Sequence, residues 1–267
     1  MIEFLQSKIA QESSAEKKIN LLRELLQLLC LKILHDKSYF ANMAFVGGTA
    51  LRVLFDMKRF SEDLDFSLIN NTHYDFTKMI KTLERELKSY ALDVNIKNNA
   101  SKTAQSSMLK FPELLNAVGL SNLKEQNVSI KLEIDSNPPD GWQIESSLIN
   151  KTYVINITHL NLPSLYAAKL HACFFRRYTK GRDFYDMLWY LGKKIKPNYI
   201  LLNNAIQQTH PSHGKINENN IKNFLLEKIK KIDFDTVKKD VGRFLEDKNE
   251  LKLLDGTVIS KAVQDCF

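Results

Sequence analysis

The sequence predicts an α+β fold, with a mixed sheet and helices up to about residue 160 and a helical part after it. Two observations carry this prediction. In the first part, short apolar or alternating segments interleave with amphipathic segments of helix length, as in a domain built around one sheet. From Leu162 onward, helical spacing dominates and strand patterns become sparse. We therefore place a boundary near Asn161, which gives domains at residues 1–160 and 161–267.

Each element follows from a local pattern. Helices are expected where apolar residues recur every three or four positions, at residues 17–35, 49–57, 73–92, 162–178 and 183–194 and within 218–254. Strands are expected where short apolar or alternating runs occur, at residues 44–48, 63–69, 91–98, 106–114 and 128–137. Pro163 suits the first turn of the helix over 162–178, with Asn161 or Ser164 as its cap.

The composition is that of an ordinary globular protein with a basic balance. Hydrophobic residues make up 44 % and charged residues 26 %, and the formal net charge is +7, which favours an anionic partner. No apolar run approaches the roughly 20 residues that span a bilayer, and no secretory signal is evident, so we expect a cytoplasmic protein without membrane association. Cys30, Cys173 and Cys266 lack paired spacing and are expected to be buried free thiols.

Two aspartates stand one residue apart in the strand expected at 63–69. Because successive side chains of a strand alternate, Asp63 and Asp65 share one face. Two like charges on one face repel, and Mg²⁺ removes that cost because it binds carboxylate oxygens and keeps positions for phosphates. Two such ions bridged by carboxylates stabilise in-line displacement at phosphorus. The alternative is a solvated strand edge with two unrelated acids.

A glycine turn precedes the two aspartates. After a strand, Gly47 and Gly48 let the backbone approach a ligand closely, and Thr49 stands at the expected N-cap of the following helix. Backbone N–H groups and the helix dipole there suit a phosphate. The alternative is a plain strand-to-helix turn. The combination of the two glycines with the two aspartates nevertheless favours a phosphate site.

A third acid is expected on a neighbouring strand. Glu133 fits, since apolar residues flank it on both sides as they do Asp65. Asp135 lies on the same face two residues later, and the choice between the two acids stays open. A single exposed acid on an amphipathic strand is the alternative.

These residues resemble a known family. The sequence GGT at 47–49 followed by SEDLDF at 61–66 resembles the metal-binding core of the DNA polymerase β-like nucleotidyltransferase superfamily. The longer pattern GGTALR…RFSEDLDF resembles the AbiEii/AbiGii toxin family. The resemblance implies an N-terminal nucleotidyltransferase domain with a mixed sheet and a C-terminal helical domain. It also implies an NTP substrate, two Mg²⁺ ions held by Asp63, Asp65 and Glu133, and nucleotide binding by Gly47, Gly48, Thr49, Arg52 and Ser61.

A second group follows in the helical part. Lys169 stands among alanines and leucines, where a lysine lies either at a rim or at a functional cleft. Asp183 and Asp186 would face one side of a helix, although Asp183 could instead cap that helix or pair with Arg182 or Lys180. The arrangement of KLHA at 169–172 followed by KGRD at 180–183 and by Asp186 resembles the toxin family's downstream motifs. This implies that Lys169 contacts the triphosphate and that Asp183, or alternatively Asp186, belongs to the catalytic cluster.

A basic segment lies between Lys169 and Asp183. The guanidinium groups of arginine suit a phosphate backbone, and an aromatic ring suits a stacked base. The alternative is a solvated loop. Its candidate RNA-binding residues are Arg176, Arg177, Lys180 and Arg182, around Tyr178. The family likeness implies an RNA acceptor such as the tRNA 3′ end, inhibition of translation and growth, and a cognate antitoxin. Two rivals are transfer to a small molecule or protein, and a nucleotide- or RNA-binding module without catalysis.

Overall fold

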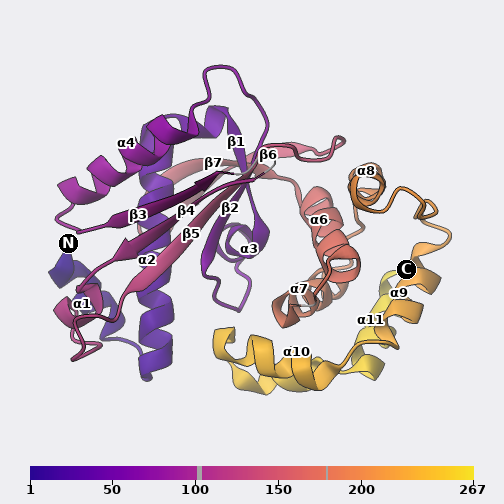
Figure 1. Ribbon diagram of the computed structural model, residues 1–267. Coiled ribbons are helices and arrows are strands. Elements are labelled where there is room, and N and C mark those ends of the chain that lie inside the picture. Colours follow the sequence, from indigo (N-terminus) through magenta and orange to yellow (C-terminus); the bar gives the residue numbers. More distant parts are fainter. Residues whose placement is uncertain (101–103, 179) are drawn as a thin grey trace. The chain divides into compact units, whose positions relative to one another are not determined.

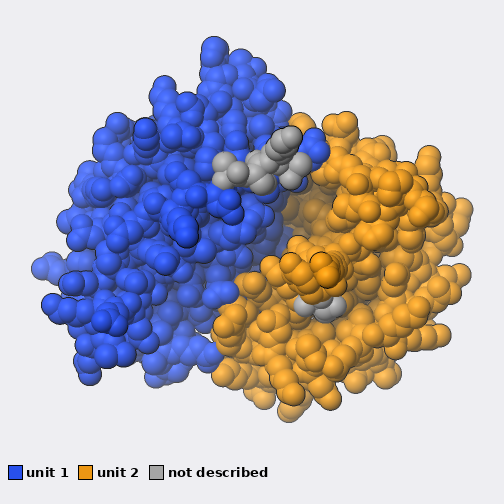
Figure 2. Space-filling model, viewed as in Figure 1, with its two compact units in different colours: residues 1–137, 145–159 blue, residues 138–144, 160–267 orange. Residues whose placement is uncertain are grey.

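The computed structural model describes residues 1–100, 104–178 and 180–267. These residues form two compact units, coloured separately in Figure 2. The first unit contains residues 1–137 and 145–159, and the second contains residues 138–144 and 160–267. Thr179, within the predicted basic segment, lies outside the described residues.

A seven-stranded mixed sheet forms the centre of the first unit (Figure 1). Its strand order is β3-β4-β5-β2-β1-β7-β6. β1 pairs antiparallel with β2 and parallel with β7, whereas β2 pairs parallel with β5. The predicted mixed sheet is therefore confirmed. The strands are β1 (Met43–Val46), β2 (Asp63–Leu68), β3 (Asn95–Ala100), β4 (Ala104–Phe111), β5 (Val128–Asp135), β6 (Ile144–Asn150) and β7 (Val154–Leu160).

Two helices of the first unit, α2 and α4, begin at residues whose side chains cap them. Ser14 accepts a hydrogen bond from the Lys17 N–H at the start of α2, and Asp75 accepts one from the Lys78 N–H at the start of α4. On α4, Glu84 and Lys88 stand four residues apart and form an ion pair at 2.7 Å. The helices are α1 (Ile2–Ile9), α2 (Ala15–Asp36), η1 (Tyr39–Ala41), α3 (Gly47–Phe55), α4 (Phe76–Ser89) and α5 (Leu114–Ala117).

The sheet has one apolar face and one polar face. On β5 the residues alternate between buried and partly exposed, and Ile130, Leu132 and Ile134 belong to the buried set. Leu64 and Phe66 of β2 join them in one hydrophobic core with apolar side chains of α2 and α4. The polar residues of β2 and β5 consequently share the opposite face, because strand side chains alternate.

Helices make up most of the second unit. Asn161 caps α6 by accepting a hydrogen bond from the Ser164 N–H at 3.0 Å, and Pro163 lies in the first turn, so the predicted start is confirmed. Tyr166 and Tyr190 stack between α6 and α7 with ring centroids 4.4 Å apart. The helices are α6 (Leu162–Phe175), α7 (Gly181–Gly192), α8 (Tyr199–Thr209), α9 (Ile221–Ile229), α10 (Phe234–Val241), η2 (Gly242–Phe244), η3 (Lys248–Leu253) and α11 (Gly256–Cys266).

Two strands were not predicted individually. β6 lies at one edge of the sheet and has one buried residue, Ile149, and β7 lies between β6 and β1. The three cysteines are buried free thiols, as predicted. Among the residues that the structure describes, no helix is both long and apolar enough to cross a membrane.

Candidate active site

The glycine turn connects β1 directly to α3. Helix α3 begins at Gly47, whose φ is +79°, and its N-cap is Val46, without a capping side chain. The prediction that Thr49 would cap this helix is therefore wrong. Thr49 is instead buried inside the first turn of α3, where its hydroxyl donates a hydrogen bond to the backbone carbonyl of Asp63. This bond ties the start of α3 to the start of β2.

Both glycines make room for side chains of the same unit. A Cβ atom added to Gly47 would lie 2.4 Å from Oδ2 of Asp65. A Cβ atom added to Gly48 would lie 2.3 Å from Nη2 of Arg59. The turn is thus packed against a carboxylate at one glycine and a guanidinium at the next. The sequence pattern predicts that the two glycines let a ligand approach, and it does not single out Arg59.

The strand register gathers the predicted acids on the polar face of the sheet. Asp65 of β2 lies directly beside Glu133 of β5, and Asp63 lies beside Lys131. All four side chains are partly exposed. Asp135 lies further along, beside Ser67. The register therefore places Glu133, rather than Asp135, next to the aspartate pair.

Lys131 is an internal counter-ion on this acidic face. Its ammonium donates a hydrogen bond to the carboxylate of Glu133. Burial disfavours the charged form of Lys131, but the hydrogen bond and charge of Glu133 raise its pKa above the ordinary lysine value. The negative charges of Asp63 and Asp65 act in the same direction. Lys131 was not among the predicted site residues, although it alternates in sequence with Glu133.

The donor set has the chemistry of a site for a hard divalent cation. Asp63 and Asp65 offer carboxylate oxygens on one strand face, which is what Mg²⁺ prefers. Within the described part of the chain, no three acidic, histidine or cysteine side chains form a metal-binding cluster. The carboxylate of Glu133 is paired with Lys131. Asp63 and Asp65 thus fit Mg²⁺ by donor type, and Glu133 is the adjacent carboxylate.

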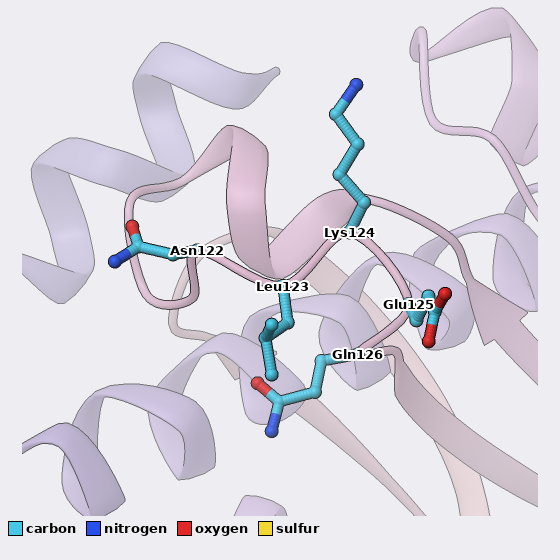
Figure 3. Close-up of a pocket in the computed structure, with 5 residues that line it drawn as sticks. All are labelled: Asn122, Leu123, Lys124, Glu125 and Gln126. Carbon is cyan, nitrogen blue, oxygen red and sulfur yellow. The ribbon is translucent and has the colours of Figure 1, made fainter.

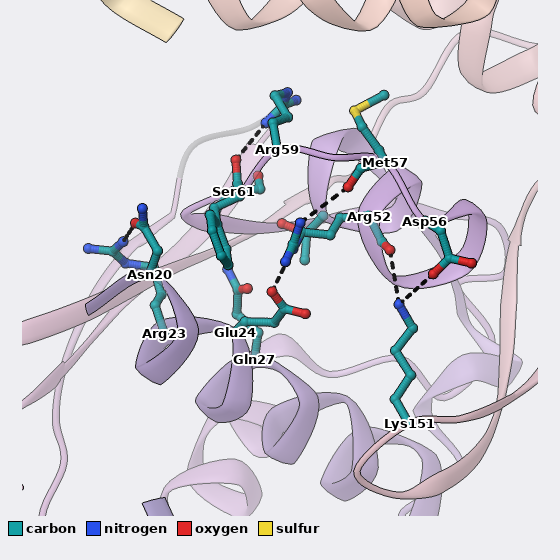
Figure 4. A network of polar contacts seen from close by, with 12 residues as sticks. Asn20, Arg23, Glu24, Gln27, Arg52, Asp56, Met57, Arg59, Ser61 and Lys151 are labelled. Carbon is teal, nitrogen blue, oxygen red and sulfur yellow. Dashed lines mark hydrogen bonds and ion pairs between the residues drawn. The ribbon is translucent and has the colours of Figure 1, made fainter. Parts of the chain in front are cut away.

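Arg52, another predicted nucleotide-binding residue, is engaged within the first unit (Figure 4). Its Nε donates to the carboxylate of Glu24 at 2.5 Å, and its Nη1 donates to the Met57 carbonyl at 3.2 Å. Its guanidinium also lies over the ring of Phe60, 4.0 Å from the centroid. These contacts link α2, α3 and the segment before β2. Ser61, also predicted to bind nucleotide, is buried, and its carbonyl accepts from the Gln27 amide at 3.1 Å.

Replacing Arg52 with alanine is expected to lower the free energy of unfolding by about 2–3 kcal/mol, because the largely buried Glu24 loses its charged partner. Arg52→Lys should retain part of this stability. Urea denaturation of the purified chain measures the effect. Unchanged stability together with an increased KM for nucleotide would instead assign Arg52 to direct binding.

Lys169, Asp183 and Asp186 form one ion-pair network in the second unit. The ammonium of Lys169 lies 2.7 Å from Oδ1 of Asp183 and 2.8 Å from Oδ2 of Asp186. Oδ2 of Asp183 accepts from Arg176 at 3.0 Å. The two aspartates therefore share one side of α7, as predicted. Asp183 does not serve as the N-cap of α7, which is Lys180.

Most of the predicted basic segment lies between α6 and α7, and its last residue, Arg182, lies in the first turn of α7. Arg176, Arg177 and Lys180 are exposed, and the side chain of Tyr178 is 68 % exposed. The guanidinium of Arg182 lies 4.6 Å from the ring centroid of Phe244. The segment thus presents cations and an aromatic ring to solvent.

A surface pocket of about 410 Å³ lies elsewhere in the first unit (Figure 3). It is lined by Asn122, Leu123, Lys124, Glu125 and Gln126, in the loop before β5. None of the predicted site residues lines it.

Comparison with known proteins identifies the family. A family model described as the nucleotidyl transferase AbiEii toxin of a type IV toxin–antitoxin system matches residues 29–266. The chain belongs to the AbiEii toxin family. For this AbiEii-family chain, membership supports a nucleotidyl-transfer role as a toxin and implies a nucleotide substrate and an antitoxin partner. A search of curated proteins finds no significant match to this chain.

Solved structures share the AbiEii-family chain's fold. JHP933 from Helicobacter pylori is 21 % identical, with a TM-score of 0.54 over 92 % of this chain and 93 % of that one. A candidate nucleotidyltransferase from H. pylori is 20 % identical, with a TM-score of 0.54 over 92 % of this chain and 95 % of that one. At these identities the likeness shows the fold alone.

Proposed function

We propose that this AbiEii-family chain is a Mg²⁺-dependent enzyme that transfers a nucleoside monophosphate from an NTP to a hydroxyl of RNA, such as the tRNA 3′ end. The acceptor oxygen forms a bond to the α-phosphorus while the bond to the bridging oxygen breaks. Pyrophosphate leaves, and the hydroxyl proton passes to a base. The observation that carries this proposal is the strand register, which places Asp63, Asp65 and Glu133 on one face beside the glycine turn.

Asp63 and Asp65 would hold the Mg²⁺, and Glu133 would join them or accept the proton of the attacking hydroxyl. The metal supplies charge neutralisation at the phosphates. The backbone of Gly47 and Gly48 would bind phosphate at the start of α3, where N–H groups point outward. The rigid attachment of Thr49 to β2 holds this turn beside the acids. Positioning and electrostatics then provide most of the catalysis.

The proposal that RNA is the acceptor is supported by exposed residues of the second unit. The exposed Tyr178 and the surrounding arginines suit a phosphate backbone with a stacked base. The assignment of Lys169 to the triphosphate and of Asp183 to catalysis also belongs to this proposal. Modification of tRNA would stop translation and growth, and the antitoxin would relieve that effect.

Purified protein incubated with each labelled NTP, Mg²⁺ and total RNA tests this function. We expect label on RNA that disappears with EDTA or with RNase treatment, and sequencing of the labelled RNA identifies the modified end. Label that persists after RNase would indicate a small molecule or protein as acceptor. Binding of NTP without transfer to any of these acceptors would contradict the enzyme and favour a binding module.

A further inference from the structure

Lys131 and Glu133 lie two residues apart on the polar face of the sheet. Both belong to β5, and the strand register places Lys131 beside Asp63 and Glu133 beside Asp65 of β2. The ammonium of Lys131 is paired with the carboxylate of Glu133. Their side chains are 40 % and 37 % exposed, so an ion from solvent can reach both of them. A cation of the chain itself therefore already occupies part of the acidic face.

This ion pair and a divalent cation compete for the same carboxylate. Like charges repel over a few ångströms, so an ammonium held on Glu133 opposes a divalent ion on that group. Asp63 and Asp65 act on the same ammonium through their negative charges, which would also attract a divalent ion. Ion pairs with this degree of exposure contribute little to stability. A divalent ion can therefore displace the ammonium from Glu133.

We propose that Lys131 competes with the metal ion for Glu133, so that this carboxylate joins Asp63 and Asp65 at the metal only after the ammonium is displaced. This rests on the proposed function, since it concerns the Mg²⁺ site of that reaction. Lys131 thereby lowers the affinity of the acidic face for a divalent ion. A substitution that removes only the ammonium should raise that affinity.

Calorimetric titration of the full chain with Mg²⁺, in the absence of nucleotide, tests this competition. Lys131→Met removes the ammonium and keeps an unbranched side chain. We expect it to tighten Mg²⁺ binding at least about fivefold, because a repelling charge beside the ion is lost. Lys110→Met is the matched control, since Lys110 is exposed on the same face of neighbouring β4, two residues after Met108, which lies beside Lys131. It should bind Mg²⁺ within about twofold of the wild type, because exposed charges are screened by salt.

A double-mutant cycle with Glu133→Gln separates competition from general repulsion. If the ammonium only repels the ion, Lys131→Met gives the same gain in the wild-type and the Glu133→Gln background. Competition predicts a gain at least about threefold larger in the wild-type background, because only there is a carboxylate released to the metal. Equal gains in the two backgrounds, or unchanged affinity in a folded Lys131→Met chain, would overturn the proposal. Lys131→Gln carries the same test if Lys131→Met does not fold.

A further variant locates the bound ion. Asp65→Asn, added to Lys131→Met, should remove most of the Mg²⁺ binding, because Asp65 lies directly beside Glu133. Binding that persists in this double variant would place the ion elsewhere and count against the competition.

Failure of this proposal is distinguishable from failure of the proposed function. Nucleotide transfer by the wild type, together with equal Mg²⁺ affinity of the wild type and Lys131→Met, would remove the competition alone. A wild type that transfers no nucleotide, and no Mg²⁺ binding by either chain, would remove both.

Discussion

Replacing Asp63 or Asp65 with asparagine is expected to lower nucleotidyl transfer by at least about a hundredfold while the chain stays folded. Each substitution removes one negative charge from the polar face of the sheet, where the aspartates lie beside Lys131 and Glu133. Loss of one preorganised electrostatic contact at a reacting phosphate costs a hundred- to thousandfold in rate. Loss of a carboxylate ligand to Mg²⁺ acts on the same step. Steady-state labelling of RNA at several Mg²⁺ concentrations measures the effect.

A neighbouring acid provides the matched control for these variants. Glu62 directly precedes Asp63, and its carboxylate pairs with Arg23 at 3.7 Å. Glu62→Gln removes the same charge one residue away, and we expect transfer within about threefold of the wild type because the residue has no proposed role. Equal loss in Glu62→Gln and Asp63→Asn would show that general charge, rather than the two aspartates, controls the reaction.

Replacing Asp186 with alanine is expected to lower the free energy of unfolding by about 3 kcal/mol. Its side chain is 0 % exposed and lies 2.8 Å from the ammonium of Lys169, itself largely buried. Removing one partner of a buried pair leaves an uncompensated charge, which costs about 3–5 kcal/mol. We expect the lower end of that range because Asp183 still pairs with Lys169. Thermal and urea unfolding followed by circular dichroism measure the loss.

A double variant tests the contribution of the pair of Asp186 and Lys169. The double variant Lys169→Met, Asp186→Leu should regain only part of the stability lost by Asp186→Ala, because it leaves no buried charge at position 169 or 186 but also removes the ammonium that pairs with Asp183. Asp235→Asn, on the exposed surface of α10, is the control and should change stability by less than about 0.5 kcal/mol. A fully stable Asp186→Ala variant would contradict a structural role for this ion pair.

The period of the apolar residues predicted most of the fold, and the exceptions have physical reasons. The long helix α2 and the alternating strand β5 have strong patterns because each buries one side against a large core. Edge strand β6 buries one residue, so its sequence shows no alternation to recognise. In β7, by contrast, Ile155 and Ile157 are buried in alternation, and this signal could have been used.

The candidate site was predictable where chemistry followed strand alternation and not where it depended on packing. Asp65 and Glu133 were identified as neighbours from their apolar flanks, and the register places them side by side. Arg52 and Arg59 both follow the glycines in sequence, but only the folded chain distinguishes them. Arg52 contacts Glu24 of α2, whereas Arg59 lies against Gly48. No linear spacing predicts which of two arginines a turn will accommodate.

The connection of β1, α3 and β2 has a consequence for how the chain folds. The glycine turn, Thr49 and the two aspartates all lie within residues 43–68, and their contacts close short loops. Pairing of β2 with β5 joins Asp65 to Glu133 across a much longer stretch of chain. Short loops close at lower entropic cost and therefore sooner. We expect Glu133 to be the last of the three acids to reach its position during refolding, so substitutions in β5 should chiefly accelerate unfolding.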